Sequence, residues 1–191
     1  ASRGMYTYPY NGLIYVLTGS SSLFETVTVD SGGIGSAPYN RTPAGLTVDD
    51  ANMWWMDALY DTATGNTNIY AHVAQNLYDI SSSENGTIYT GDITATTVLT
   101  ALAGAPSVSG GLLALHPYLV VYGNNGYVAW SAAGDPTDWT FAPAGPGEAW
   151  VTAQKIVAAI ATRGGAGNSP SALLWSLDSL IRMSSVSYTH L

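Results

Sequence analysis

The chain has 191 residues, of which 47% are hydrophobic and only 9% are charged, and its 21 Gly and 13 Tyr favour an all-β fold with a sizeable buried core. Its formal net charge of −8 argues against broad binding to phosphate backbones, though not against an acidic channel through which nucleic acid slides, and we expect no sequence-specific nucleic-acid binding. The absence of cysteine excludes disulfides and thiolate metal sites, and no apolar run reaches the roughly 18 residues of a membrane span.

Taken in chain order, four stretches share one pattern: an apolar β-favouring run, a tight polar or Gly-containing turn, and a second run that opens on a bulky residue. They are Leu13–Val27, Asn68–Ile80, Tyr118–Trp130 and Ala172–Met183. The bulky opening residues, which we call anchors, recur about every fifty residues and are Leu23, Leu77, Tyr127 and Leu180. A strand-built repeat of this length is typical of the blades of a β-propeller.

Each hairpin supplies the second and third strands of a predicted four-stranded antiparallel blade. The innermost strands are predicted at Gly4–Tyr8, Met53–Tyr60, Leu112–His116 and Ile156–Thr162. The last of these mixes helix-favouring and strand-favouring residues, and the repeat decides for a strand. The outer strands are predicted at Gly45–Val48, at Thr87–Thr90 or Thr96–Leu99, and at Thr137–Phe141. The sequence therefore predicts a partial β-propeller of about three and a half blades.

Side chains alternate between the two faces of a strand, so the anchors also predict orientation. The residues one position after each anchor are predicted to point into the space between blades: Phe24, Tyr78, Val128 and Ile181. The residues two positions after each anchor are predicted to face solvent: Glu25, Asp79, Ala129 and Arg182. The Gly-Asn-Asn-Gly turn at 123–126 is the clearest hairpin signal, because Asn and Gly accept the positive φ of tight turns.

We expect residues 1–185 to form a single, truncated propeller segment, because known propellers close with about four to eight blades. The C-terminal residues Val186–Leu191 resemble the translated mosaic-end adapter of transposase-based sequencing libraries. This resemblance implies an artefact at the end of a metagenomic fragment, and it removes His190 from any functional argument. An unclosed propeller leaves an apolar blade face bare, so we expect the segment to be marginally stable alone or to oligomerise.

The most distinctive string is Ser131–Trp139, which is similar to the Asp-box turn of sialidase-type propellers (Ser-x-Asp-x-Gly-x-Thr-Trp). The similarity fails at Ala133, where that turn has Asp, and a turn capped by Asp135 explains the string more simply. From this string and the tryptophan pair of the second blade we predict the ligand or partner contacts of the chain. They are Trp54, Trp55, Asp135, Asp138 and Trp139.

The remaining titratable residues do not form a catalytic or metal-binding motif. Asp49, Asp50 and Asp57 surround the tryptophan pair as the paired acids of a glycosidase would, but nothing in their spacing fixes a separation between carboxylates. Caps at a strand start explain these acids more simply. His72 and His116 stand on different predicted strands without a neighbouring carboxylate cluster. We therefore predict no catalytic residue, no metal and no cofactor.

Several short strings together resemble β-propeller virion proteins of tailed phages, in particular the packaged-DNA-stabilisation or tail-hub proteins of short-tailed phages. The strings are Ser2–Gly4, Tyr15–Val16, Gly19, Leu23–Phe24, Leu119–Gly123, Val128–Ser131, Gly134–Trp139, Gly167–Pro170 and Leu174–Arg182. The resemblance implies a non-enzymatic part of the head–tail connector, ringed around the portal axis, that helps to retain packaged DNA. It implies portal, adaptor and tail proteins as partners, a homo-oligomeric ring, and a virion location after assembly in the host cytoplasm.

Two other classes of function stay open beside the structural one. A carbohydrate-binding propeller would use exposed Trp and Tyr side chains, and it needs aromatic rings that stand free on one face. A glycosidase would need two carboxylates that converge on the mouth of the central tunnel. We prefer the structural virion role, which clear turnover of a glycoside would contradict.

Overall fold

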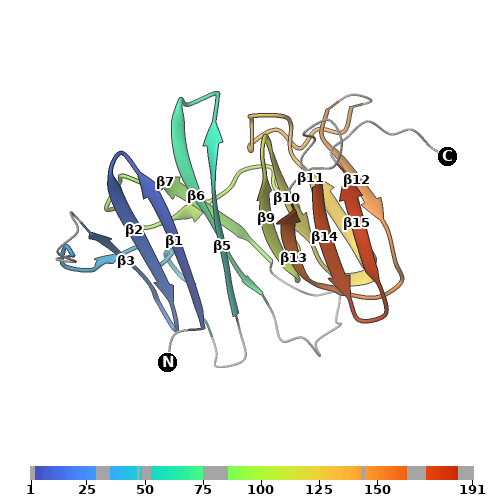
Figure 1. The fold of residues 1–191 in the computed structure, drawn as a ribbon, viewed down its shortest axis with the longest axis horizontal. Helices are drawn as coiled ribbons and strands as arrows, with labels where there is room; N and C mark the ends of the chain where they lie inside the picture. Colours follow the sequence, from blue (N-terminus) through green and yellow to red (C-terminus); the bar gives the residue numbers. More distant parts are fainter. Residues whose placement is uncertain are drawn as a thin grey trace.

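The computed structural model of the chain describes residues 3–28, 35–46, 48, 53–74, 86–142, 145–162 and 171–184. These residues form four antiparallel sheets, each built from strands that follow one another in the chain (Figure 1). The described residues contain one 3-10 turn, Asn124–Gly126, and no α-helix. The prediction of an all-β fold is therefore confirmed.

The four sheets, numbered as blades 1 to 4, contain the following strands. Blade 1 contains β1 (Gly4–Tyr10), β2 (Leu13–Gly19), β3 (Leu23–Thr28) and β4 (Tyr39–Asn40). Blade 2 contains β5 (Met53–Asp61), β6 (Asn66–Ala74), β7 (Ile88–Asp92) and β8 (Thr100–Ala101). Blade 3 contains β9 (Gly111–Leu115), β10 (Tyr118–Tyr122), β11 (Tyr127–Trp130) and β12 (Gly147–Trp150). Blade 4 contains β13 (Ile156–Thr162), β14 (Ser171–Ser176) and β15 (Leu180–Ser184).

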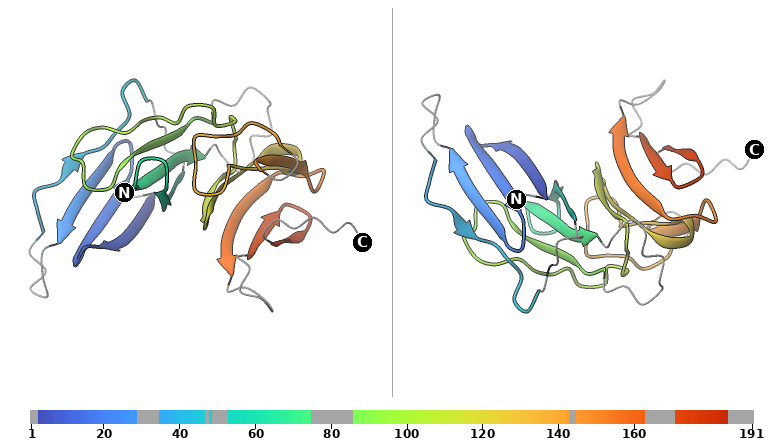
Figure 2. Two further views of the ribbon diagram at one scale, coloured as in Figure 1. Left: turned by 90° about the horizontal axis from the view of Figure 1, so that it is seen from above. Right: turned by 90° about the horizontal axis from the view of Figure 1, so that it is seen from below.

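The first strand of each blade is the innermost one. Strand β1 lies beside β5, β5 beside β9, and β9 beside β13. Figure 2 shows the sheets fanned around these strands as an arc, with blades 1 and 4 at its two ends. This is the arrangement of a β-propeller, with three four-stranded blades and a last blade of three described strands. The predicted partial propeller of about three and a half blades is confirmed.

The long apolar runs form strands where the sequence predicted them. The inner strands begin at Gly4, Met53, Gly111 and Ile156, each within one residue of its predicted start. The stretch of mixed propensity is strand β13 over its whole predicted range, because the adjoining blade covers it and tertiary packing outweighs the helix propensity of its alanines. The turn before β11 also forms as predicted, with φ of 54° at Asn125 and 67° at Gly126.

The second predicted hairpin, Asn68–Ile80, is wrong in its third strand. Strand β6 pairs with β7, which begins only at Ile88. The anchor of this blade is therefore Ile88, which is buried, whereas Leu77, Tyr78 and Asp79 lie outside the described residues. A short apolar run in the sequence can resemble a strand without being one, and pairing across the sheet decides which run forms the third strand.

The outer strands are short, and the predictions for them are wrong. Strand β4 is at Tyr39–Asn40 rather than Gly45–Val48, and β12 is at Gly147–Trp150 rather than Thr137–Phe141. In blade 2 the outer strand is Thr100–Ala101, just after the predicted Thr96–Leu99, while the alternative Thr87–Thr90 overlaps the third strand. Strands of two residues carry almost no propensity signal, because the edge of the preceding strand sets their position.

Three hydrophobic clusters fill the spaces between neighbouring blades. The cluster between blades 1 and 2 contains Tyr15, Leu17, Leu23, Trp54, Ile69, Ala71, Ile93 and Leu99. The cluster between blades 2 and 3 contains Leu59, Tyr70, Ile88, Leu102, Val108, Leu112, Leu119, Val121 and Ala129. The cluster between blades 3 and 4 contains Leu113, Leu115, Val120, Tyr122, Val128, Trp130, Ile156, Ala172 and Leu174. Each interior blade thus buries both faces, and each end blade buries one.

Every blade has a forward face, turned to the next blade along the chain, and a backward face, turned to the preceding one. The first residue of the third strand points forward in blades 1, 2 and 4, where it is Leu23, Ile88 and Leu180. Blade 3 is out of step by one residue, because Val128 points forward into blade 4 and Tyr127 points backward. The blades therefore repeat regularly in space, although the residue that points forward shifts by one position along the sequence in blade 3.

These faces decide the orientation predictions. Val128 and Ile181 lie between blades and Arg182 is exposed, as predicted. The predictions for Phe24, Glu25 and Ala129 are wrong. Phe24 is 39% exposed on the backward face of blade 1, whereas Glu25 and Ala129 are buried on faces that neighbouring blades cover. In blade 1 alternation separates the two faces but does not tell which one blade 2 covers, and in the interior blade 3 both faces are covered.

Candidate functional site

The string Ser131–Trp139 forms a compact turn after β11. Asp135 Oδ1 accepts hydrogen bonds from the backbone N–H of Thr137 at 3.0 Å and from its hydroxyl at 2.7 Å. These bonds, the hydroxyl bond first, lower the pKa of Asp135 below its ordinary value. Asp138 Oδ1 accepts from the N–H of Thr140 at 2.9 Å. Both carboxylates therefore cap the turn, as a Ser/Thr/Asp-rich loop favours.

The turn is fastened to blade 2 and it orients a tryptophan. Thr62, in the β5–β6 turn, donates its backbone N–H and its hydroxyl to the carbonyl of Gly134, at 2.8 and 2.7 Å. At the other end of the turn, Trp139 Nε1 donates to the carbonyl of Pro136 at 2.7 Å. The indole ring is thereby held against the cluster between blades 2 and 3 while part of it stays exposed.

A pocket of about 210 Å³ opens beside this indole ring. Its lining residues come from blade 3 and from the loop that leads into it: Gly104, Pro106, Tyr127, Ala129, Trp139, Phe141, Gly147 and Glu148. Three of the eight are aromatic, and Phe141 is 74% exposed at the rim. Such a surface suits a ligand with a flat apolar face and hydroxyl groups.

The polar part of the pocket is a pair of side chains on neighbouring strands. Tyr127 lies on β11, and Glu148 lies on β12 directly opposite Ala129. The hydroxyl of Tyr127 donates to Glu148 Oε2 at 2.8 Å. Partial burial, and then the hydrogen bond and charge of Glu148, raise the pKa of Tyr127 above its ordinary value. Among the eight lining residues Glu148 is the one carboxylate, so the pocket does not bring together two acids.

The tryptophan pair of β5 lies apart from this pocket and packs between blades. Trp54 is 4% exposed, and its Nε1 donates to the carbonyl of Ser20 at 2.8 Å. Trp55 points to the other side of the strand and meets the ring of Tyr122 edge-on, with centroids 6.4 Å apart. The five predicted contact residues are thus divided: Asp135, Asp138 and Trp139 share one turn, and the two β5 tryptophans lie elsewhere.

Asp57 forms a junction of three inner strands. Its Oδ1 accepts from the hydroxyl of Tyr6 on β1 at 3.0 Å, and its Oδ2 accepts from the N–H of Ala114 on β9 at 2.8 Å. Burial raises the pKa of this carboxyl, while the hydrogen bonds from Ala114, Ala58 and Tyr6 oppose that rise. Asp49 and Asp50, the other acids considered for catalysis, lie outside the described residues.

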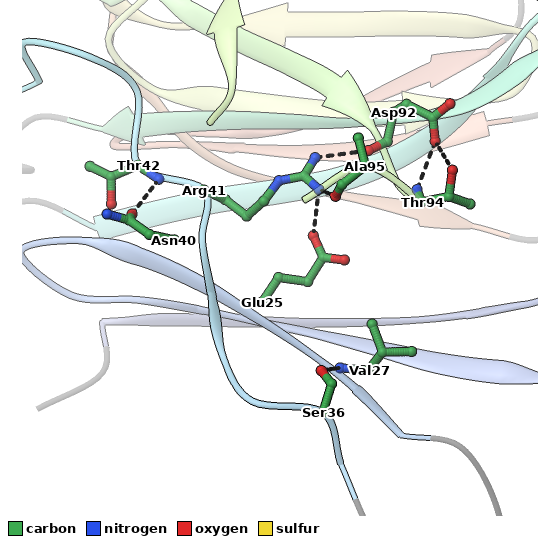
Figure 3. A network of polar contacts seen from close by, with 9 residues as sticks. All are labelled: Glu25, Val27, Ser36, Asn40, Arg41, Thr42, Asp92, Thr94 and Ala95. Atoms are coloured by element: carbon green, nitrogen blue, oxygen red, sulfur yellow. Dashed lines mark hydrogen bonds and ion pairs between the residues drawn. The ribbon is translucent and has the colours of Figure 1, made fainter. Parts of the chain in front are cut away.

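A second buried polar group fastens blade 1 to blade 2 (Figure 3). Arg41 follows β4 and is fully buried, and its Nη1 lies 3.0 Å from Glu25 Oε2. The guanidinium also donates to two carbonyls of blade 2: Nη2 to Asp92, the last residue of β7, at 2.8 Å, and Nη1 to Ala95 in the following loop. Arg41 therefore neutralises a buried carboxylate and ties together two blades.

His72 and His116 do not meet. His72 is fully buried on β6, where its Nδ1 lies 3.2 Å from the carbonyl of Thr87, whereas His116 is exposed in the turn after β9. Among the described residues, no three His, Cys, Asp or Glu side chains are grouped so that they could hold a metal ion. In the same part of the chain, no helix is long and apolar enough to cross a membrane.

Sequence reasoning found Trp139 but missed its partners in the pocket. Tyr127 is one of the predicted anchors and Phe141 ends a predicted outer strand, but no pattern in the sequence points to Glu148. The aromatic residues of the 127–141 stretch were the available signal; only the pairing of β11 with β12 adds the carboxylate to them. Comparisons with protein-family models, with curated proteins and with solved structures gave no match.

Proposed function

We propose that the chain is a structural, non-enzymatic propeller segment that works by protein–protein assembly. The observation that carries this proposal is the apolar character of both end faces of the arc. On blade 1, Met5, Ile14 and Phe24 are 69%, 50% and 39% exposed. On blade 4, Ile160, Trp175 and Leu180 are 52%, 38% and 56% exposed. Large exposed apolar patches of this kind mark interaction surfaces.

The same strand position is buried wherever a neighbouring blade covers it. Leu23, Ile88 and Leu180 all open a third strand and all point forward, and they are 0%, 1% and 56% exposed. Leu180 differs only in having no following blade in the described chain. Among the described residues, no sheet covers the two end faces, and such exposed blade-packing surfaces suit an assembly protein.

The finer proposal is a virion role in the tail or head–tail connector of a tailed phage. It is supported by the strings that resemble tail-hub propellers, and by a net charge of −8, which keeps a surface from gripping passing DNA. The partners would be portal, adaptor and tail subunits, and the protein would be located in the virion. Its contribution would be a rigid framework that helps to retain packaged DNA.

Two measurements test the virion role. Portal or terminase genes should lie beside the gene on the source DNA, and the purified chain should co-sediment with the portal or adaptor rings encoded there. A ring-shaped protein from an unrelated source, which should not co-sediment with the chain, is the matched control. Neighbouring genes for polysaccharide degradation, together with turnover of a chromogenic glycoside, would contradict both the virion role and the non-enzymatic one.

A second candidate function is carbohydrate binding, and the pocket beside Trp139 favours it. Aromatic rings and the Tyr127–Glu148 pair offer stacking surface and hydrogen-bond acceptors for sugar hydroxyls. Titration with a panel of oligosaccharides, followed by tryptophan fluorescence, tests the idea. Phe141→Ala should weaken binding at least tenfold, while Leu177→Ala, which removes an exposed apolar side chain far along the chain on the β14–β15 turn, should leave binding unchanged. Equal affinities for the two variants would contradict this function.

A further inference from the structure

We propose that two copies of the chain pack head to tail, the forward face of blade 4 of each copy against the backward face of blade 1 of the other. The proposal rests on the assembly role proposed above and names its partner. It starts from the repeat: within the chain, each forward face is covered by the backward face of the following blade. The structure thus shows three times which kind of surface fits which.

The two end faces are the members of this pairing that stay open. The forward face of blade 4 carries Ala158, Ile160, Leu173, Trp175, Leu180 and Arg182. The backward face of blade 1 carries Met5, Thr7, Pro9, Ile14, Val16, Thr18, Phe24 and Thr26. Within the chain, every covered forward face packs against a backward face. The backward faces of blades 2, 3 and 4 are already covered by the preceding blades. The free one belongs to blade 1.

Blade 1 of the same molecule cannot serve, because blades 1 and 4 lie at opposite ends of the arc (Figure 2). Blade 1 of a second copy meets the requirement. If both copies exchange the same contact, two identical interfaces form and the assembly closes with twofold symmetry. Two arcs of four blades give eight blades, which is within the range of about four to eight found in propellers.

Charge favours the same two faces. The chain carries 13 carboxylates and five basic residues, so most surfaces of two copies repel each other. The strand residues that form the two end faces include no carboxylate, and the one charged residue among them is Arg182. The two copies therefore approach where the repulsion is weakest and the exposed apolar area is large.

The oligomeric state of the full chain tests the proposal. Sedimentation equilibrium at micromolar concentration should give twice the monomer mass of 19.9 kDa. Met5→Glu on one face, and Leu180→Glu on the other, should each raise the dissociation constant at least 100-fold. Both residues are exposed within the chain, so the variants should keep the near-UV circular dichroism of the folded protein. Val98→Glu, at an apolar position of the β7–β8 loop that is 42% exposed, is the control and should stay dimeric.

A mixture of the two variants separates this arrangement from other dimers. Leu180→Glu retains an intact blade 1 face and Met5→Glu retains an intact blade 4 face, so an equimolar mixture should form a pair through one unaltered interface. A dimer that joins two copies of the same face predicts disruption by one variant only and no rescue on mixing.

A monomer at 100 µM, an open polymer or a same-face dimer would each overturn the proposal. A monomer that still co-sediments with portal or adaptor rings would overturn the head-to-tail pair and leave the assembly role standing. A head-to-tail dimer that ignores those rings would support the pair and contradict the virion role. The two proposals therefore fail separately.

Discussion

Glu25 and Arg41 form an ion pair that is almost completely shielded from solvent, with side chains 1% and 0% exposed and 3.0 Å between Oε2 and Nη1. Burial raises the pKa of Glu25, and the charge of Arg41 opposes that rise. Because the guanidinium also serves the carbonyls of Asp92 and Ala95, this one side chain links β3, the segment after β4 and a loop of blade 2.

Removal of one partner of this pair should destabilise the protein far more than replacement of both partners by apolar residues. Arg41→Met leaves Glu25 buried without a counter-charge, and it should lower the free energy of unfolding by about 3–5 kcal/mol. The double variant Glu25→Met/Arg41→Met buries no charge, so it should cost clearly less than the sum of the two single changes. Urea denaturation of the four proteins of this double-mutant cycle measures the coupling. Additive effects would contradict the pair.

Asp57→Asn should loosen the junction of the three inner strands. An amide has one oxygen to accept where the carboxylate uses two, so either Tyr6 or Ala114 loses its acceptor. We expect a loss of about 1–3 kcal/mol of unfolding free energy. Tyr6→Phe removes only the hydroxyl that donates to Asp57 Oδ1 and is the graded control, with a loss of about 1 kcal/mol. A smaller effect for Asp57→Asn than for Tyr6→Phe would show that Asp57 is no junction.

His72 should make the protein less stable as the pH falls from about 6.5 to about 4. Burial, with a smaller contribution from Lys155, lowers its pKa from 6.5 to about 4, while the carbonyl of Thr87 opposes the shift. The unfolded chain therefore takes up this proton first. Stability is fully present above pH 6.5 and is lost as the pH approaches 4, by on the order of 3 kcal/mol.

The matched variant for this prediction is His72→Gln, whose amide can still donate to Thr87. Urea denaturation at pH 7 and pH 4.5 should show a larger loss of unfolding free energy on acidification for the wild-type protein than for the variant. Glu25 and Asp57 have raised pKa values and so change stability in the opposite sense, equally in both proteins. An identical pH dependence in the two proteins would exclude His72 as its source.

Gly126→Ala should destabilise the turn before β11 more than an otherwise similar change elsewhere. Gly126 has φ of 67°, and a Cβ atom there would lie 2.1 Å from the carbonyl oxygen of Thr152. Gly12, with φ of 76°, has no atom within 4 Å of such a Cβ. Gly12→Ala should thus cost only the strain of a left-handed residue, about 1–2 kcal/mol.

Both glycines have positive φ, so the difference between the two destabilisations measures the steric clash at Gly126 alone. Gly126→Ala should cost about 1–3 kcal/mol beyond Gly12→Ala, because β12 and the following segment have to shift. Thermal unfolding gives the comparison directly, with the lower Tm expected for Gly126→Ala. A lower Tm for Gly12→Ala would contradict the close contact with Thr152.

The sequence predicted those parts of the fold that local chemistry determines. The inner strands are apolar runs of five to nine residues, and the Gly-Asn-Asn-Gly turn needs positive φ at Asn125 and Gly126. The two-residue outer strands were beyond such reasoning, because their position depends on the strand beside them. The burial of Glu25 was equally hidden: its partner Arg41 lies on another segment, and nothing in the chain around either residue signals that they meet.

The candidate site divides in the same way. Asp135, Asp138 and Trp139 were found together because they are contiguous, and they share one turn. Glu148 shares the pocket with Trp139 because β12 pairs with β11, whereas the sequence predicts the outer strand of this blade at Thr137–Phe141. Trp54 is buried because blade 1 covers it. The sequence repeat predicts that blade 1 lies beside blade 2, but not which side chains of blade 2 it covers.

In the described part of the chain the buried clusters join each blade to the blades next to it in sequence, so the arc behaves as a linear series of coupled units, as in solenoid proteins. Opening of an end unit breaks one coupling, and opening of an interior unit breaks two. Slow amide hydrogen exchange should therefore be concentrated in β6 and β10, with faster exchange in β3 and β15. A second molecule that joined the two ends would remove this gradient and make the whole assembly melt as one cooperative body.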